Sequence, residues 1–284
     1  MSVTPVLADL PRAVTEPDSA VIRVLSYNVR SLRDDRHALA RVVRACAPDV
    51  LCVQEAPRFF RWRKAASWLA RETGLVYTTG GATTAGPMIL TSLRAHVERT
   101  EEILLPRTPG LHQRGLATAV LRFGGLGGSG AGGSGAGQES AGQESAGQES
   151  ASAIRLGVVC CHLSLSADER YAQAGLVLDR VAALGVPCVV AGDLNDRPGG
   201  RAFRRLTGTL RDGWETRPWG GAFTSTPDDP HQRIDAVLAT ERVDVLGCGV
   251  PAGLPGVADA DLRAATDHLP VLAAVRVPRL TAAG

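Results

Sequence analysis

Short apolar runs bounded by glycine, proline and polar clusters recur along most of the chain, at lengths typical of β-strands. In several intervening stretches the apolar residues are spaced three and four positions apart, which predicts amphipathic helices. The predicted strands cover residues 21–29, 48–55, 75–80, 87–92, 95–105, 114–123, 153–164, 186–193, 233–239, 243–250 and 269–277. The predicted helices cover residues 34–47, 57–74, 166–185 and 199–207. This alternation predicts an α/β fold in which packed sheets carry helices on the outside.

Polar residues at two of the predicted helix starts indicate caps. Asp34 or Asp35 is placed to cap the first helix, because a side-chain oxygen there can accept from the free amides of the first turn. Ser166 and Glu169 have the spacing of a capping box at the start of the third helix.

The predicted helix at 57–74 opens with an alternation of arginine and aromatic residues, "PRFFRWRK". Phe59, Trp62, Ala66 and Leu69 would fall on one face, so the periodicity favours a face that packs against the core. The alternative is a surface that stacks on nucleic acid, which interleaved arginines and aromatics also suggest.

Residues 124–152 interrupt the pattern with a stretch of almost nothing but Gly, Ala, Ser, Gln and Glu, in which "GQESA" recurs. Such a composition cannot bury enough apolar surface to offset its ordering entropy, so we interpret it as a disordered insertion. The flanking strands are then expected to be neighbours within one domain, because closing a long loop adds little free energy. The expected organisation is an extension over 1–20, a domain over 21–277 and a tail over 278–284.

The net charge adds little to the prediction of fold and function. Thirty-one basic residues against 29 acidic ones give a net charge of +2, which excludes the broad cationic footprint of strong nucleic-acid binders. The six cysteines stand mostly inside apolar runs and lack a paired CxxC spacing, so they are expected to be core residues in a reducing compartment. No stretch has the length of a membrane span and no signal peptide is recognisable, so we expect a cytoplasmic protein that acts as a monomer.

Polar residues gather where the predicted strands end. They are Asn28, Gln54, Glu55, His162, Asp193, Asn195, Asp267 and His268, and Asp235 adds a carboxylate inside an apolar strand. Carboxylates beside a buried strand are costly unless something pairs with them, and a cation is the obvious candidate. Mg²⁺ prefers carboxylate, amide and water oxygens, often together with a substrate phosphate.

Each of these residues also has an ordinary structural explanation. Asn28 could be a turn residue, Glu55 a helix-capping acid and His162 a histidine satisfied at a sheet edge. Asp235 could serve as an ion-pair partner for Arg233. Together, however, they supply what hydrolysis of a phosphate ester requires: metal ligands, a group that activates water, and donors for the charge on the phosphoryl oxygens.

Six motifs in order carry a family resemblance: "SYNVR", "VQE", "CHLS", "GDLND", "RIDAVL" and "TDHLPV". In this order they resemble the endonuclease/exonuclease/phosphatase superfamily, which includes deoxyribonucleases, apurinic endonucleases, inositol polyphosphate phosphatases and sphingomyelinases. The resemblance spans residues 21–277 without the insertion. It implies a four-layer α/β sandwich, two mixed sheets flanked by helices, with the site at one edge of both sheets.

The resemblance also implies roles for the residues. Glu55 would be the main ligand of Mg²⁺ or Mn²⁺, with Asn28 and Asp267 beside it. Arg30 stands where some relatives carry an acid. Apart from the resemblance, Arg30 and Arg114 are candidates to line a substrate-binding cleft, and Arg114 could equally be a surface residue at a strand start.

The catalytic roles are carried over in the same way. Asp193 and Asn195 would orient the attacking water and the phosphate. His268, held by Asp235, would act as base or as a phosphate-binding cation, since a carboxylate on one ring nitrogen fixes the tautomer. His162 is the general-acid candidate, although "TAGPMIL" holds no acid where deoxyribonuclease-like members supply its carboxylate partner.

The expected function is therefore metal-dependent hydrolysis of a phosphodiester by in-line attack of water, with nucleic acid as one candidate substrate. A phosphomonoesterase or a lipid-headgroup phosphodiesterase on the same residues is the alternative, because fold does not separate these activities. A catalytically inactive binding scaffold is a third hypothesis, which the complete set of polar residues disfavours.

Overall fold

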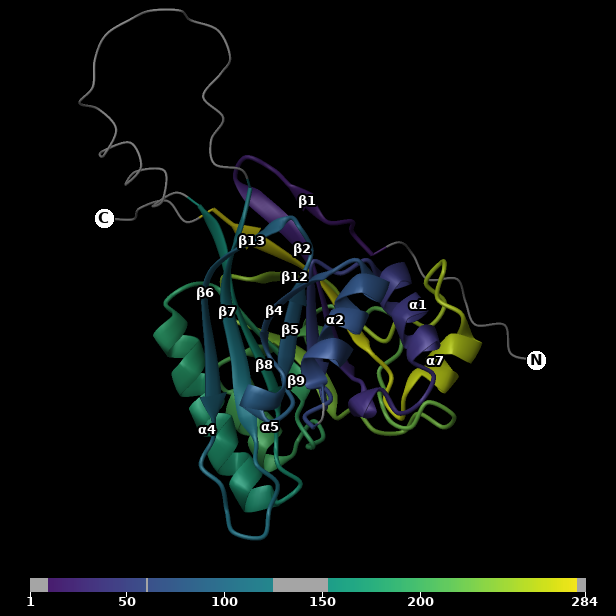
Figure 1. Ribbon diagram of the computed structural model, residues 1–284. Coiled ribbons are helices and arrows are strands. Elements are labelled where there is room, and N and C mark those ends of the chain that lie inside the picture. Colours follow the sequence, from purple (N-terminus) through teal and green to yellow (C-terminus); the bar gives the residue numbers. More distant parts are fainter. Residues whose placement is uncertain (1–9, 60, 125–152, 280–284) are drawn as a thin grey trace, which may run out of the picture.

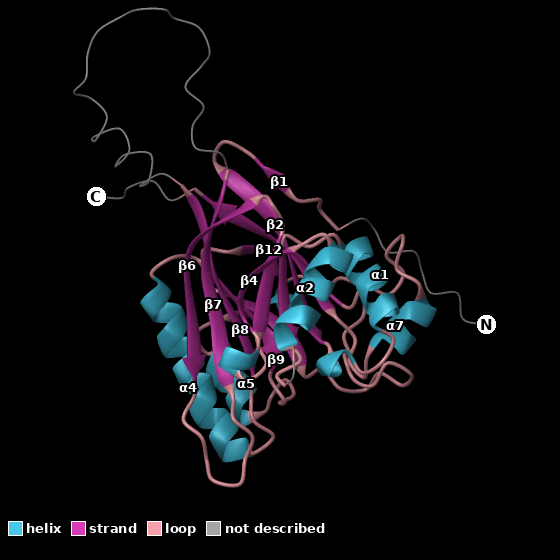
Figure 2. Ribbon diagram, viewed as in Figure 1, coloured by secondary structure: helices cyan, strands magenta, loops and turns pink. Residues whose placement is uncertain are grey.

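Two mixed β-sheets pack face to face, with helices on both outer faces (Figures 1 and 2). The computed structural model describes residues 10–59, 61–124 and 153–279. The four layers follow from the sequence pattern, since alternating strand residues face either the other sheet or a helix layer. The predicted four-layer α/β sandwich is confirmed.

The first sheet contains both ends of the described chain. Its order is β12 (Asp244–Gly249), β13 (Val271–Pro278), β2 (Ser19–Asn28), β3 (Val50–Gln54), β5 (Met88–Thr91) and β4 (Val76–Gly80). A two-residue strand, β1 (Val14–Thr15), pairs with β2, and Leu10 before it is buried in the core. Residues 10–20, which the sequence placed in an extension, therefore also contribute to this sheet.

The second sheet comes from the middle of the chain. Its order is β10 (Arg211–Asp212), β11 (Asp235–Ala239), β9 (Cys188–Asp193), β8 (Ile154–His162), β7 (Gly115–Phe123) and β6 (Ala95–Leu104). Small and β-branched residues such as Val24, Cys52, Ala119 and Val158 fill the space between the two sheets. All six cysteines are free and buried, as their apolar settings predicted.

The helices cover opposite faces of the sandwich (Figure 2). Those on the first sheet are α1 (Arg36–Cys46), α2 (Trp62–Thr73) and α7 (Asp259–Ala265); those on the second are α4 (Ala167–Leu184) and α5 (Arg201–Thr207). Short turns complete the set: η1 (Arg30–Leu32), η2 (Ala82–Thr84) and α6 (Gly213–Thr216). Among the described residues, no helix is long and apolar enough to cross a membrane.

Two parallel strand pairs bring polar strand ends to one edge. β2 and β3 are joined through α1 and run parallel, with Asn28 opposite Gln54. β8 and β9 are joined through α4 and also run parallel, with His162 opposite Asp193. Because carboxyl ends of parallel strands meet at the same edge, each sheet presents a pair of polar ends there.

The segment 124–152 enters and leaves at the opposite end of the sandwich. Residues 125–152 lie outside the described residues, so the interpretation of this stretch as disordered remains a prediction. Its flanking strands are antiparallel neighbours, with Phe123 opposite Ile154, which confirms the predicted pairing. The same two strands carry Gly115 and His162 at their other ends, so the length of a strand separates Phe123 and Ile154 from the polar edge.

The two predicted helix caps have different outcomes. Asp35 caps α1, accepting from the amides of His37 and Ala38 at 2.9 and 3.0 Å. The predicted capping box is wrong: Ser166 makes no side-chain cap, and Glu169 accepts instead from the amide of Thr108 across the β6–β7 loop.

The predicted packing of Phe59 is also wrong. Its side chain is 76% exposed, because α2 begins only at Trp62, after Arg61 in a left-handed conformation. Phe59 therefore precedes the helix and has no place on its buried face, whereas Ala66 and Leu69 are buried as predicted.

Candidate active site

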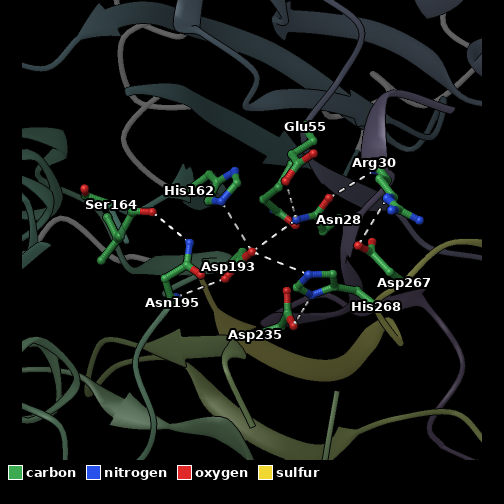
Figure 3. A network of polar contacts seen from close by, with 12 residues as sticks. Asn28, Arg30, Glu55, His162, Ser164, Asp193, Asn195, Asp235, Asp267 and His268 are labelled. Carbon is green, nitrogen blue, oxygen red and sulfur yellow. Dashed lines mark hydrogen bonds and ion pairs between the residues drawn. The ribbon is translucent and has the colours of Figure 1, made fainter. Parts of the chain in front are cut away.

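One amide joins acids from the two sheets (Figure 3). Asn28, the last residue of β2, donates from Nδ2 to Glu55 Oε1 at 3.3 Å and to Asp193 Oδ2 at 3.1 Å. Glu55 follows β3 in the first sheet, and Asp193 ends β9 in the second. The two groups of strand ends that the sequence predicted separately thus form one site.

Asp193 lies at the centre of this site. Its Oδ1 accepts from the amide of Asn195 at 3.0 Å, and its Oδ2 lies 3.4 Å from Nε2 of His162 and 3.9 Å from Nε2 of His268. Burial, and then the nearby charge of Asp235, raise the pKa of Asp193, while the two histidines act against the rise. A carboxylate with a raised pKa is suited to accepting a proton.

The pairing of His268 with Asp235 has the geometry of an orienting dyad. Nδ1 of His268 lies 2.8 Å from Oδ2 of Asp235. Burial opposes the charged ring, but the charge and hydrogen bond of Asp235, together with the charges of Asp193 and Asp267, raise the pKa of His268 to about 10. The alternative partner of Asp235 is wrong, because Arg233 pairs with Asp212 and Glu215 at 2.5 and 2.8 Å.

His162 has the opposite electrostatic setting. Burial lowers the pKa of this ring to about 3, and the charges of Arg114 and Arg58 act in the same direction against the attraction of Asp193. His162 is therefore neutral near pH 7. Among the described residues, the carboxylate that it contacts is Asp193, which it shares with His268.

Arg114 brings a cation close to the acids. Its side chain is 8% exposed, and its Nε has no hydrogen-bond partner among the described residues. Burial lowers the pKa of the guanidinium, while the charges of Asp193 and Glu55 favour its charged form. A buried arginine with an unused donor can bind an oxyanion next to these acids.

Arg30 and Asp267 contact each other. Nε of Arg30 lies 3.3 Å from Oδ2 of Asp267, and its Nη1 lies 3.4 Å from Oδ1 of Asp34 (Figure 3). Both partners are about half exposed. Asp267 thus contacts a predicted substrate residue instead of the other two predicted metal ligands, Glu55 and Asn28, with which the structure records no contact.

Three site residues have a positive φ, which non-glycine residues rarely adopt. Arg30 has φ of 43°, Glu55 has φ of 53° and Asn195 has φ of 49°. The Asn195 side chain is held by a hydrogen bond from Nδ2 to the carbonyl of Leu163 at 2.9 Å. Such conformations persist where the surrounding structure holds them, and they are frequent at functional sites.

Thr224 supports the dyad and was not found by sequence reasoning. It is fully buried, its Oγ1 accepts from the amide of Asp235 at 3.3 Å, and its carbonyl accepts from the amide of Leu269 at 2.6 Å. It therefore ties the loop after His268 to the start of β11. It stands in a polar loop, where no periodicity distinguishes it from a turn residue.

The donor set fits a hard divalent cation. Glu55, Asp193 and Asp235 bring three carboxylates into one linked network, and the buried Oδ1 of Asp235 has no hydrogen-bond partner among the described residues. Ligand atoms of Asp193, Asp235 and His268 also lie within 4.8 Å of one another, but a protonated His268 ring that pairs with Asp235 cannot ligate a metal ion. Oxygen ligands with surplus negative charge suit Mg²⁺ or Mn²⁺ better than softer metals.

Comparison with known proteins agrees with this arrangement. The sequence model of the Endonuclease/Exonuclease/phosphatase family matches residues 25–268, a range that includes all the polar strand ends. The chain belongs to this family. Its members are hydrolases that act on phosphate esters and usually use a divalent metal. No curated protein matches the chain.

Solved structures of the endonuclease/exonuclease/phosphatase family share the fold at low identity. A family member from Bacteroides vulgatus is 17% identical, with 90% of this chain and 98% of that chain covered and a TM-score of 0.63. The mannosyl-6-phosphatase Bt3783 of Bacteroides thetaiotaomicron is 17% identical, with 89% and 99% covered and a TM-score of 0.65. A humanized D. rerio TDP2 is 18% identical, with 90% and 98% covered and a TM-score of 0.62.

Proposed function

We propose that this family member is a Mg²⁺- or Mn²⁺-dependent phosphodiesterase that hydrolyses its substrate by in-line attack of water. The observation that carries the proposal is the bridge from Asn28 to Glu55 and Asp193, which joins a metal-binding acid of one sheet to a proton-accepting acid of the other. Family membership supports phosphate-ester hydrolysis in general.

Glu55 is the principal metal ligand in this proposal. It is partly exposed, and Asn28 orients its carboxylate from behind. The bound ion would polarise the phosphate and neutralise charge that develops on its oxygens. Asp267 can join Glu55 and Asn28 when it leaves Arg30, which frees Arg30 for the substrate.

Asp193 takes the proton from the attacking water. Its raised pKa suits this role, and Asn195 holds Oδ1 so that Oδ2 faces the site. His268 is charged at neutral pH because Asp235 stabilises the imidazolium, so it acts as a phosphate-binding cation rather than as the initial base. His162, which is neutral, donates or accepts one hydrogen bond, and Arg114 adds a second cation for the phosphoryl oxygens.

A phosphomonoesterase is the second candidate. The two cations, His268 and Arg114, would also suit the doubly charged phosphate of a monoester, and one structural neighbour is named as a mannosyl-6-phosphatase. A lipid-headgroup phosphodiesterase would use the same residues.

The test is hydrolysis by the purified protein with Mg²⁺, with Mn²⁺ and with EDTA. The substrates are single-stranded DNA, single-stranded RNA, plasmid DNA, 4-nitrophenyl phosphate and sphingomyelin vesicles. We expect a diester to be cleaved only when the metal is present, and we expect EDTA to abolish this cleavage. Hydrolysis of 4-nitrophenyl phosphate alone would establish the monoesterase instead, and no hydrolysis of any substrate with either metal would favour an inactive scaffold.

A further inference from the structure

A cavity of about 360 Å³ is lined by residues of α2, β4 and β6 and of the turn that precedes β5. It is lined by Trp62, Arg63, Ala66, Ser67, Tyr77, Thr83 and Glu102. Its volume is in the range of small-molecule sites. The proposed hydrolytic mechanism uses none of these residues.

A single turn separates this cavity from Glu55. At one end of the turn, Gly81 has φ of +96° and lies so close to Trp62 that a Cβ there would be 3.1 Å from the indole ring. At the other end, the carbonyl of Gly86 accepts from the amide of Ala56 at 3.0 Å, directly after Glu55. The amide of Gly86 donates to the carbonyl of Gly81 at 2.8 Å, so the two ends are adjacent and the cavity adjoins the metal side of the site.

The cavity presents aromatic rings and a cation. The rings of Trp62 and Tyr77 are 6.4 Å apart at 54°, and the guanidinium of Arg63 lies 4.5 Å from the centroid of a Trp62 ring. Tyr77 is 37% exposed and Arg63 is exposed. A planar heterocycle can stack on the flat, charged guanidinium of Arg63. It can also displace the guanidinium and stack on the flat indole of Trp62.

Polar groups at the same cavity can read the edge of such a heterocycle. Glu102 is fixed by the amide of Gly80 at 2.8 Å and by the hydroxyl of Thr79 at 3.2 Å, both of which donate to Oε1. Its Oε2 has no hydrogen bond within the described residues and can accept from an exocyclic amino group. Burial, and then Glu102, raise the pKa of Tyr77, whose neutral hydroxyl donates to the carbonyl of Gly80.

Arg58 supplies a cation between the cavity and the acids. Its Nη1 donates to the carbonyl of Ala85 at 3.1 Å, which holds the guanidinium against the separating turn. A phosphate bound beside Arg58 would link a group in the cavity to the scissile phosphate, which the proposed mechanism places at Glu55 and Arg114. Aromatic rings with a cation nearby are features of surfaces that bind nucleotides.

We propose that this cavity, defined by Trp62, Arg63, Tyr77 and Glu102, binds a nucleobase adjacent to the scissile phosphodiester. The substrate class is then a nucleotide diester, supplied either by a single-stranded nucleic acid or by a small dinucleotide. This inference rests on the proposed phosphodiesterase function and narrows it. From the "RFFRWRK" alternation, Trp62 and Arg63 line this cavity, whereas Phe59 is exposed and lies outside its lining.

The test compares diesters with and without bases on the full-length protein. One pair is a deoxyadenosine dinucleotide and its analogue with two abasic sugars, and the other is a single-stranded deoxyadenosine decamer and its fully abasic counterpart. The variants are Trp62→Leu and Tyr77→Leu. Trp68→Leu is the matched control, because Trp68 lies on the same helix but contacts Arg36 and His37 outside the cavity.

We expect the ratio of kcat/KM with bases to kcat/KM without bases to fall at least about tenfold in both cavity variants and to stay unchanged in Trp68→Leu. A fall confined to the decamer identifies a nucleic-acid strand as the source, and a fall in both pairs includes small nucleotides. Melting curves establish that each variant is folded.

The outcomes separate this inference from the proposed function. If the wild-type protein cleaves the diesters but the ratio does not change, or both substrates of a pair lose activity equally, the base site is wrong and the phosphodiesterase stands. If the wild-type protein cleaves no nucleotide diester with either metal, but hydrolyses 4-nitrophenyl phosphate or sphingomyelin, both the base site and the nucleotide substrate are wrong.

Discussion

The two ends of the sandwich each bury an aspartate, and the two differ in how their oxygens are used. Asp49 and Asp235 are both 2% exposed. Asp49, before β3 at the end far from the site, accepts from the amide of Arg23 at 3.0 Å, the hydroxyl of Ser92 at 3.0 Å and Nη1 of Arg94 at 2.7 Å. Asp235, at the site end, uses one oxygen for His268 and leaves the other without a partner among the described residues.

This difference agrees with a structural role for Asp49 and with the functional role proposed for Asp235. Buried polar atoms are nearly always hydrogen-bonded in folded proteins, so an exception calls for an explanation. At Asp49 the chain itself supplies every partner. Among the described residues, Oδ1 of Asp235 and Nε of Arg114 at the site end have no hydrogen-bond partner, so a cation could contact the first and a phosphate the second.

The largest effect is expected from Glu55→Gln, which removes a charge from the site end. Activity should be abolished because the amide binds Mg²⁺ weakly, while the fold persists because Glu55 is only partly buried. Turnover and melting temperature with and without Mg²⁺ or Mn²⁺ are the measurements. Near-normal turnover at saturating Mg²⁺ would count against Glu55 as the principal ligand.

The second prediction concerns Asp235 and His268 as a unit. Asp235→Asn and His268→Ala should each lower turnover about a hundredfold or more, and the double variant should lose far less than the product of the two factors. Turnover of the four proteins at saturating Mg²⁺ gives this double-mutant cycle, with melting curves as the control for folding. Losses that simply multiply would exclude the dyad.

Asp49→Asn should show the reverse pattern and is the matched control for Asp235→Asn. We expect the free energy of unfolding to fall by about 1–3 kcal/mol, because a charged acceptor for Arg94 and a buried hydrogen bond are lost. Turnover below the melting transition should remain unchanged. Urea unfolding and turnover measure the two quantities, and a large loss of turnover in a folded Asp49→Asn protein would remove the contrast between the two ends.

The smallest effect is expected from replacing residues 126–151 by a short Gly/Ser turn. Phe123 and Ile154 already pair, so the strands need only a closure, and a shorter loop should leave stability unchanged or slightly higher. Turnover on a small diester should not change, since the replacement lies at the end opposite His162. A marked loss of turnover would show that this segment contributes to substrate binding.

Sequence reasoning could place the strand ends of the site because their pattern is local. Glu55 and Asp193 each follow a short apolar run, and parallel pairing of such runs brings their ends together. The pairing of His268 with Asp235 needed the family resemblance as well, because 33 positions separate the two residues.

Features that depend on loop conformation were not predictable in this way. Periodicity identified the buried face of α2 but not its first residue, so Phe59 was assigned to the core. The ion pair of Asp267 with Arg30 joins η1 to the loop after α7, whose positions no local pattern encodes, so it was not predicted; the metal-ligand role of Asp267 stays a prediction. Thr224 was missed for the same reason.

The two parallel strand pairs have a consequence for the chain as a whole. Each is a strand–helix–strand unit with a polar residue ending its first strand, Asn28 or His162, and a left-handed residue just beyond its second, Glu55 or Asn195. Each sheet therefore contains one unit with the same strand–helix–strand arrangement, and the site lies where the ends of the two units meet. A chain cut within 124–152 would carry one unit on each fragment, so hydrolysis would report reassembly of the two fragments, as in a split-enzyme assay.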